Sequence, residues 1–246
     1  MITSDNWFHE WFNTSYYHIL YAYRSDEEAQ DFIKRIIEKL NWNKDSYILD
    51  LACGKGRHSN YLASKGMKVL GIDLSEQNIE YAKAHAHPNA TFKVGDMREI
   101  PFKNEFDIVV NLFTSFGYFD DKAENTHVLK EIFDALKLGG TFVFDYLNPP
   151  YVLKKLHVTN SVYLNQIHIK THKRIEGEWV IKQIDVKDGE IEKQYFERVN
   201  LLDSAWLSKQ LVEIGFEIKE HYGDYKLSEF DINNSPRSIL VANKPY

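Results

Sequence analysis

The fold of this 246-residue chain is decided by the stretch Tyr47-Ile48-Leu49-Asp50-Leu51-Ala52-Cys53-Gly54-Lys55-Gly56-Arg57. A short apolar run with strand character ends here in two closely spaced glycines, and a helix is expected to follow. Glycines at such a turn let the backbone bend sharply and approach a ligand, because no Cβ stands in the way. The stretch therefore indicates a ligand-binding turn after the first strand of an α/β sheet.

The segments around this turn alternate between strand and helix patterns. Strands are expected at 47–52, 68–73, 90–95, 106–112 and 141–146, with helices between most of them and an amphipathic helix from Asp26 to Leu40 before them. A helix from Ser204 to Glu213, capped by Gly215, and strands at 216–222 and 238–243 complete the pattern. This order predicts a doubly wound, mostly parallel sheet that binds ligands beyond the carboxyl ends of its strands.

The alternation changes after Pro149. Segments at 161–175, 178–186 and 190–200 alternate polar with apolar residues, and Glu176-Gly177 and Asp188-Gly189 interrupt them. An Asp-Gly pair between alternating segments is a hairpin signal. We therefore expect an antiparallel meander of about three strands, inserted after the fifth strand of the main sheet.

The bulk composition excludes several classes of protein. The net charge of −6 argues against a nucleic-acid-binding protein, which needs clustered cations to displace counterions. The single cysteine, Cys53, suits a reducing compartment and excludes a cysteine-built metal cluster. No apolar run reaches the length of a membrane span, and the first residues lack the pattern of a signal peptide. We expect a soluble cytoplasmic protein.

Two carboxylates follow the second and third expected strands. Asp73 can accept hydrogen bonds from both hydroxyls of a ribose. Its alternative role is to cap the next helix, although Ser75 is better placed for that. Asp96 can accept a hydrogen bond from an adenine amino group while Met97 packs on the ring; its alternative is a plain surface turn. Carboxyl ends of successive parallel strands meet at one edge of a sheet, so these residues would share a site with the glycine turn.

Together with Asn111-Leu112-Phe113, these motifs resemble the class I S-adenosylmethionine-dependent methyltransferases. The match covers residues 45 to 146 and resumes weakly after residue 204. The family has a seven-stranded sheet whose last strand is antiparallel, and S-adenosylmethionine is its cofactor. The resemblance places these residues at the cofactor, with the glycines near the methionine moiety, Asp50 at its amino group and Asn111 or Phe113 beside the sulfonium: Arg24, Asp50, Ala52, Gly54, Gly56, Arg57, Asp73, Leu74, Asp96, Met97, Asn111 and Phe113.

Within that family the chain is similar to the glycine N-methyltransferase-like small-molecule enzymes, because of its aromatic N-terminal segment and its β-rich insertion. The resemblance implies that residues 1–44 form a lid and helix, 45–148 and 203–246 the cofactor-binding core, and 149–202 an inserted subdomain over the acceptor site. Arg24 and Arg57 are rival partners for the methionine carboxylate. The N-terminal aromatic residues have a plainer alternative role, which is to anchor this segment on the domain.

Methyl transfer from a sulfonium is an in-line displacement that needs orientation, desolvation and, for some acceptors, a general base. The candidates for that base are Tyr118, Tyr16 and His18. No residue spacing suggests a metal site. The expected acceptor is a small molecule, and the sequence leaves open its identity, whether nitrogen, oxygen or carbon is methylated, and the oligomeric state.

Other functions were weighed. Asn148-Pro149-Pro150-Tyr151 matches the motif of adenine-amino methyltransferases, but there the motif follows the fourth strand, and here it follows the fifth. The two prolines also serve to stop a strand and redirect the chain. An NAD-dependent oxidoreductase is disfavoured because Ser59 stands where the third glycine of the dinucleotide motif belongs. A protein that binds the cofactor without catalysis stays open.

Overall fold

The computed structural model describes residues 7–21, 26–156 and 159–246. Its largest element is a seven-stranded sheet with the order β10-β11-β5-β4-β1-β2-β3. β11 pairs antiparallel with both of its neighbours, whereas β1, β2, β3, β4 and β5 run parallel. The fold predicted from the sequence is therefore confirmed. The strands are β1 Tyr47–Leu51, β2 Lys68–Asp73, β3 Ala90–Val94, β4 Phe106–Asn111, β5 Leu136–Leu147, β10 Glu217–Tyr222 and β11 Arg237–Asn243.

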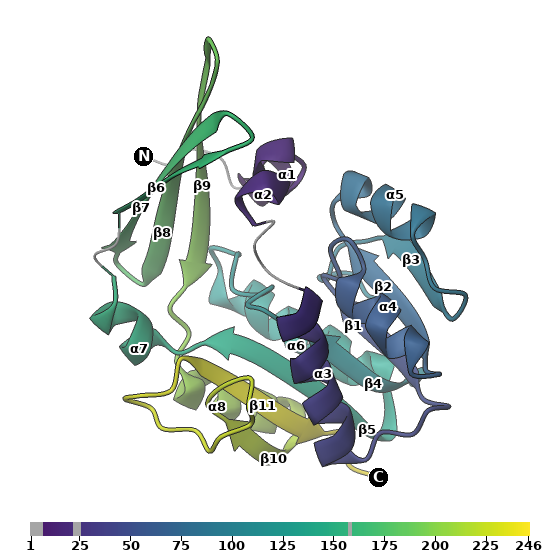
Figure 1. Cartoon of the computed structure of the whole chain (residues 1–246). Helices are drawn as coiled ribbons and strands as arrows, with labels where there is room; N and C mark the ends of the chain where they lie inside the picture. Colours follow the sequence, from purple (N-terminus) through teal and green to yellow (C-terminus); the bar gives the residue numbers. More distant parts are fainter. Residues whose placement is uncertain (1–6, 22–25, 157–158) are drawn as a thin grey trace.

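Helices cover both faces of this sheet (Figure 1). Alternate residues of β1 face opposite ways: Ile48 packs in one core with Phe32 and Leu62, while Leu49 packs in a second core with Leu129. This two-sided burial explains why the core strands read as continuous apolar runs. The helices are α3 Asp26–Leu40, α4 Arg57–Ser64 and α5 Glu76–Ala84 on the first face, and α6 Lys122–Ala135 and α8 Ser204–Ile214 on the second.

The insertion forms a separate sheet with the order β6-β7-β8-β9, all antiparallel. Four strands replace the three expected, because a turn splits segment 161–175. That turn is Asn165-Gln166, and both residues have positive φ, at 50° and 68°. The pair lacks the glycine that marks such turns in a sequence, so it gave no signal. The strands are β6 Thr159–Leu164, β7 Ile167–Glu176, β8 Trp179–Asp188 and β9 Ile191–Asn200.

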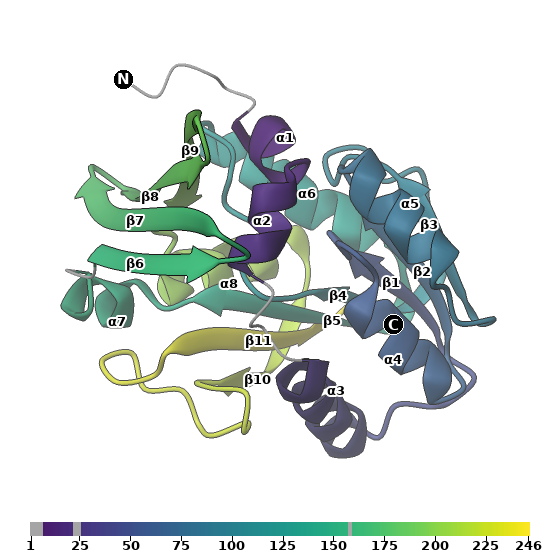
Figure 2. The same cartoon turned by 45° about the horizontal axis from the view of Figure 1, so that its top comes forward.

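Three short helices were not expected. Pro149 and Pro150 do end β5, but they also occupy the first turn of α7, Pro149–Lys154, where a missing N–H costs nothing. The N-terminal segment forms α1, Trp7–Phe12, and α2, Ser15–Leu20. Figures 1 and 2 show α1 and α2 between the inserted sheet and the carboxyl-end edge of the core sheet. No helix in the described part of the chain has the length and apolar character needed to cross a membrane.

Two glycines make a matched test of the packing under the glycine turn. Both Gly56 and Gly177 have positive φ, but a Cβ on Gly56 would lie 2.5 Å from the buried ring of Phe92, whereas Gly177 has open space. We expect Gly56→Ala to lower the free energy of unfolding by about 3 kcal/mol, from backbone strain and overpacking together. Gly177→Ala should cost about 1 kcal/mol, from strain alone. Urea unfolding measures both; equal losses would contradict the close packing on Phe92.

Candidate active site

The turn after β1 is joined to the end of β2 by hydrogen bonds. The backbone N–H of Gly54 donates to Oδ2 of Asp73 at 2.8 Å, and the N–H of Ser75 donates to Oδ1 at 2.9 Å. Ser75 caps α5, as expected. Gly54 has φ 56°, and a Cβ at this position would meet no atom within 4 Å. The turn therefore presents bare backbone to open space beside a carboxylate.

A cavity of about 110 Å³ lies beyond the carboxyl ends of β1, β2 and β3. Asp73 and Asp96 contribute carboxylates to its wall, and aromatic residues from α1 and the loop after β4 close it. Burial raises the pKa of Asp73. The lining residues are Phe8, Phe12, Tyr17, Leu51, Ala52, Gly54, Ile72, Asp73, Leu74, Gly95, Asp96, Met97, Ser115, Tyr118 and Phe119.

Asp96 is held in place by an arginine two residues along the chain. Arg98 donates from Nη2 to Oδ2 of Asp96 at 2.7 Å and also pairs with Glu124 at 2.9 Å. Burial opposes ionisation of Asp96, but the hydrogen bonds and charge of Arg98 prevail and lower the pKa of its carboxyl. The side chain is therefore an ionised, oriented acceptor at the cavity wall, as a role in binding an amino group requires.

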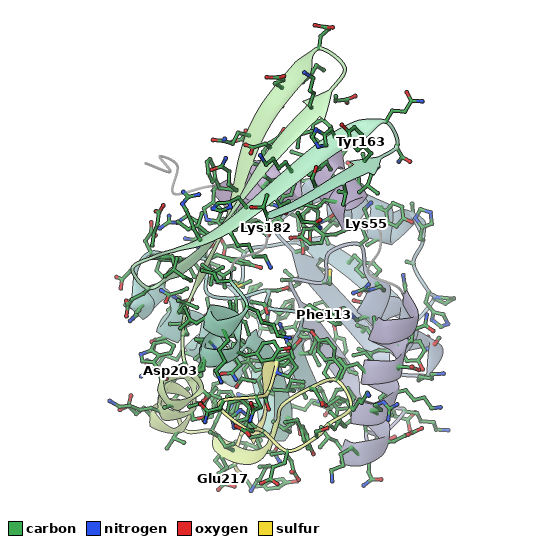
Figure 3. All side chains as sticks on the ribbon, turned by 60° about the vertical axis from the view of Figure 1, so that its left-hand side comes forward. Lys55, Phe113, Tyr163, Lys182, Asp203 and Glu217 are labelled. Carbon is green, nitrogen blue, oxygen red and sulfur yellow. The ribbon has the colours of Figure 1, made fainter. Side chains whose placement is uncertain are left out.

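A larger, more open cavity adjoins the first. The two share Phe12, Tyr17, Ala52, Gly54, Ser115 and Tyr118. The larger cavity continues past the glycine turn to α4 and is bounded on the other side by α2 and β9. Figure 3 labels Lys55 of the glycine turn and Phe113 after β4, which line this cavity, and Lys182 of the inserted sheet, which does not.

Asp50 lies at the floor of the larger cavity, 2% exposed. The hydroxyl of Ser59 donates to its Oδ2 at 2.5 Å. Burial raises the pKa of Asp50 to about 6, the nearby charge of Asp73 adds to the rise, and the Ser59 hydrogen bond opposes it. Asp50 is thus a carboxylate that changes charge just below neutral pH.

Arg57 and Phe113 are stacked on each other in the wall of the same cavity. The guanidinium of Arg57 lies over the Phe113 ring, 5.3 Å from its centroid, and the ring of His58 stacks on Phe113 at 4.9 Å. Burial, aided by the charge of Arg57, lowers the pKa of His58 to about 3, so His58 is neutral. The arrangement holds Arg57 where it can meet a carboxylate.

Some expected residues lie away from both cavities. Gly56 packs against Phe92 behind the turn. Asn111 is fully buried, and its amide donates to the carbonyls of Leu51 and Ser115 at 3.0 and 3.1 Å, so it shapes the site from below. Arg24 lies outside the described residues.

The three candidate bases differ in position. Tyr118 lines both cavities and donates its hydroxyl to the carbonyl of Thr114 at 2.7 Å. His18 lines the larger cavity, and burial, aided by the charge of Lys55, lowers its pKa to about 4. Tyr16 lines neither cavity and donates to Asp188 of the inserted sheet at 3.1 Å. Geometry therefore favours Tyr118 and His18 over Tyr16.

A polar cluster that sequence reasoning missed lies where α1 and α2 meet the inserted sheet. Glu197 of β9 accepts hydrogen bonds from Trp11 at 2.8 Å and from Tyr21 at 2.7 Å. Lys182 of β8 donates to the Tyr21 hydroxyl at 2.6 Å. Tyr21 and Glu197 line the larger cavity. An alternating strand rich in Glu and Lys gave no signal that one of its carboxylates is inward-facing.

Comparison with known proteins places this geometry in a family. Residues 48–140 match the family described as methyltransferase domain. Demethylmenaquinone methyltransferase of Lactococcus lactis is 32% identical over 80% of this chain and 77% of its own length. An N,N-dimethyltransferase of Streptomyces venezuelae that acts on dTDP-3-amino-3,4,6-trideoxy-alpha-D-glucopyranose is 32% identical over 41% of this chain and 42% of its own. The chain belongs to the class I S-adenosylmethionine-dependent methyltransferases.

Solved structures agree on the fold. The CcbJ methyltransferase of Streptomyces caelestis matches with a TM-score of 0.80 at 19% identity, covering 96% of this chain and 98% of that one. By contrast, the chain spans about two fifths to a half of the length of several curated relatives that it matches. The residues present fit S-adenosylmethionine, because Gly54 offers bare backbone beside the cavities and Asp73, Asp96 and Asp50 stand as acceptors along them.

The Asn148-Pro149-Pro150-Tyr151 motif lies away from both cavities. The Asn148 amide donates to the carbonyls of Ile232 and Ser235 at 2.9 and 2.8 Å, so it tethers the loop before β11. Pro149 is buried at the start of α7. The motif therefore has a structural use here, and nothing in the comparisons favours an adenine-amino methyltransferase or an NAD-dependent enzyme.

The pKa of Asp50 predicts opposite effects on binding and stability. The expected partner of Asp50 is the cofactor ammonium, which requires the ionised carboxylate, so we expect the affinity for S-adenosylhomocysteine to fall as pH drops through 6, approaching about tenfold per pH unit. Asp50→Asn should bind weakly at every pH. Because the folded-state pKa is raised from 3.8, the wild type loses stability as pH rises between these values, and the variant should be about 3 kcal/mol more stable above pH 6.

Calorimetric titration and urea unfolding at pH 5 to 8 measure these two effects. His18 and His58 stay neutral across this range, so neither should contribute a pH dependence of its own. If a steep pH dependence of binding persists in Asp50→Asn, the titrating group is not Asp50.

Proposed function

We propose that this protein transfers a methyl group from S-adenosylmethionine to a nitrogen or oxygen atom of a small-molecule acceptor. The observation that carries the proposal is the pair of adjoining cavities, which meet at Ala52, Gly54, Ser115 and Tyr118. The smaller cavity has the carboxylates that suit an adenosine. The larger cavity has Asp50 and Arg57 for an amino acid and continues under α2 and β9, where an acceptor has room.

This arrangement assigns cofactor binding and acceptor binding to different parts of the chain. In the proposal, residues 45–148 and 203–246 hold the cofactor, while the lid in 1–44 and the inserted subdomain in 149–202 hold the acceptor. The cytoplasmic location expected from the sequence also stays a proposal.

S-adenosylmethionine supplies a methyl group that its sulfonium charge already activates. The residues of this chain then orient the cofactor and the acceptor and exclude water from the reacting atoms. Asp73 accepts from the ribose hydroxyls, Asp96 and Met97 take the adenine, and Asp50 and Arg57 hold the charged amino-acid end. The aromatic rings from α1, α2 and the loop after β4 exclude water, which strengthens each of these electrostatic contacts.

An acceptor that loses a proton needs a group to take it. Tyr118 lies at the junction of the cavities, and its hydroxyl donates to a backbone carbonyl, which leaves its oxygen lone pairs as acceptors. His18 is neutral at physiological pH but, with a pKa of about 4, is a weak base. His18 is therefore the group that can take the proton, whereas the protonated hydroxyl of Tyr118 can accept a hydrogen bond from the acceptor and orient it at the junction of the cavities.

Two observations support a small, amine-bearing acceptor. The relatives from Streptomyces include N,N-dimethyltransferases of amino sugars carried on dTDP, and the sugar N-methyltransferase KedS8 shares the fold with a TM-score of 0.75 at 18% identity. In this chain, Glu197 lines the larger cavity, but Lys182 lies 3.7 Å from its Oε2 and Tyr21 donates to both of its oxygens, so the choice of an amine rests on the relatives. The same geometry admits an alcohol, so a panel of small amines and matched alcohols, read out by release of S-adenosylhomocysteine, decides between nitrogen and oxygen.

Asp73 is the residue on which cofactor binding should depend most. We expect Asp73→Ala to weaken S-adenosylhomocysteine binding by about a hundredfold, because two charge-assisted hydrogen bonds to the ribose are lost and the Gly54 turn loses its anchor. Asp134→Ala, at a surface ion pair on α6, is the matched control and should bind as the wild type does. Calorimetric titration measures both, with NAD as a parallel ligand. Binding of NAD alone would sink the proposed function.

A further inference from the structure

The loop after β4 has an unusual backbone. Phe113 and Thr114 are consecutive, neither is glycine, and both have positive φ, at 59° and 62°. Two such residues in succession are strained, and strain of this kind persists only where the surroundings impose it. Both residues line the larger cavity, across from the glycine turn. The strained loop is therefore part of the site wall.

Asp145 near the end of β5 holds this loop from beneath. Its Oδ2 accepts the N–H of Phe113 at 2.7 Å, and its backbone carbonyl accepts the N–H of Thr114 at 3.1 Å. The Tyr225 hydroxyl donates to the same carboxylate at 3.2 Å. Asp145 is fully buried, so these bonds are shielded from competing water.

Arg237, at the start of β11, completes the support. Its Nε donates to Oδ1 of Asp145 at 2.7 Å, and its Nη2 donates to Oγ1 of Thr114, also at 2.7 Å. One guanidinium thus spans the carboxylate and the strained loop. A buried ion pair is weak evidence for stability, because desolvation offsets its attraction. We therefore expect the Arg237–Asp145 pair to affect the conformation of the Phe113–Thr114 loop more than the stability of the fold.

The conformation of this loop determines the position of Arg57, because the Phe113 ring supports the Arg57 guanidinium. The Phe113 ring stacks on His58 and lies under the Arg57 guanidinium, 5.3 Å from its centroid. If the loop relaxed, the ring would move and Arg57 would lose its platform. The smaller cavity, with Asp73 and Asp96, has neither Phe113 nor Thr114 in its wall. The effect of the support should therefore be largest at the amino-acid end of the cofactor site, although Tyr118, which donates to the Thr114 carbonyl, lines both cavities.

We propose that Arg237 is a positioning residue for methyl transfer: through Asp145 and Thr114 it holds the strained Phe113–Thr114 loop, and with it Arg57, at the amino-acid end of the cofactor. This inference rests on the proposed function. Arg237 itself lines neither cavity. It comes from a strand that follows the whole inserted segment, far in sequence from the glycine turn.

Two ligands separate the two ends of the site. S-adenosylhomocysteine has the amino-acid part, and 5′-methylthioadenosine lacks it. Thr114→Val keeps the Arg237–Asp145 pair but removes the hydroxyl that Arg237 contacts, and Arg237→Lys removes the guanidinium that bonds to both Asp145 and Thr114. We expect each variant to weaken S-adenosylhomocysteine binding by about tenfold in calorimetric titration. Binding of 5′-methylthioadenosine should stay within about twofold. Thr114→Ser, which keeps the hydroxyl, should restore binding, and Thr126→Val on α6 is a control for loss of a threonine hydroxyl.

The double variant distinguishes positioning from direct contact. If Arg237 acts through Thr114, the two losses should not add, so Thr114→Val/Arg237→Lys should bind S-adenosylhomocysteine about as weakly as either single variant. Additive losses, equal losses for both ligands, or unchanged binding in folded Arg237→Lys would each overturn the proposal. A wild type that binds neither ligand would instead overturn the proposed function. Thermal melting of each variant shows that the chain compared is folded.

Discussion

The hydrogen bond between the Gly54 amide and the Asp73 carboxylate is the contact on which the site depends. It joins the turns at the ends of two adjacent parallel strands, so the glycine turn is coupled to Asp73, the residue proposed to bind the ribose. The parallel register of β1 and β2 brings the two turns within reach, with Leu51 opposite Ile72.

Near that junction, two buried carboxyl groups lower the stability of the folded protein when they are ionised. Asp50 and Asp145 are almost fully buried, and burial raises the pKa of each carboxyl. Replacing a buried ion pair with well-packed apolar residues of similar size often raises the free energy of unfolding by about 1–4 kcal/mol. The site thus shows the conflict between stability and activity that is expected where a protein must bind charged groups in a dry cavity.

The core of the fold was readable from the sequence because its determinants are local. The apolar run before Asp50, the glycines after it and the repeat of strand and helix fix the sheet, and Asp73 and Asp96 follow from their positions at strand ends. The four-stranded insertion was misjudged by one strand, because Asn165-Gln166 turns without glycine. Contacts between distant segments carried no local signal: the roles of Glu197 and Arg237 depend on tertiary packing that no spacing along the chain encodes.

The N-terminal helices α1 and α2 are joined to the insertion by hydrogen bonds from Trp11 and Tyr21 to Glu197, which involve no residue of the seven-stranded sheet. The two segments are separated by the whole of the first five strands, yet residues of both line the larger cavity. They should therefore vary as a unit among relatives while the glycine turn stays constant. A chimera that takes the insertion of another methyltransferase needs the matching N-terminal helices with it, and because Phe8, Phe12 and Tyr17 of these helices also line the smaller cavity, the graft changes one wall of that cavity too.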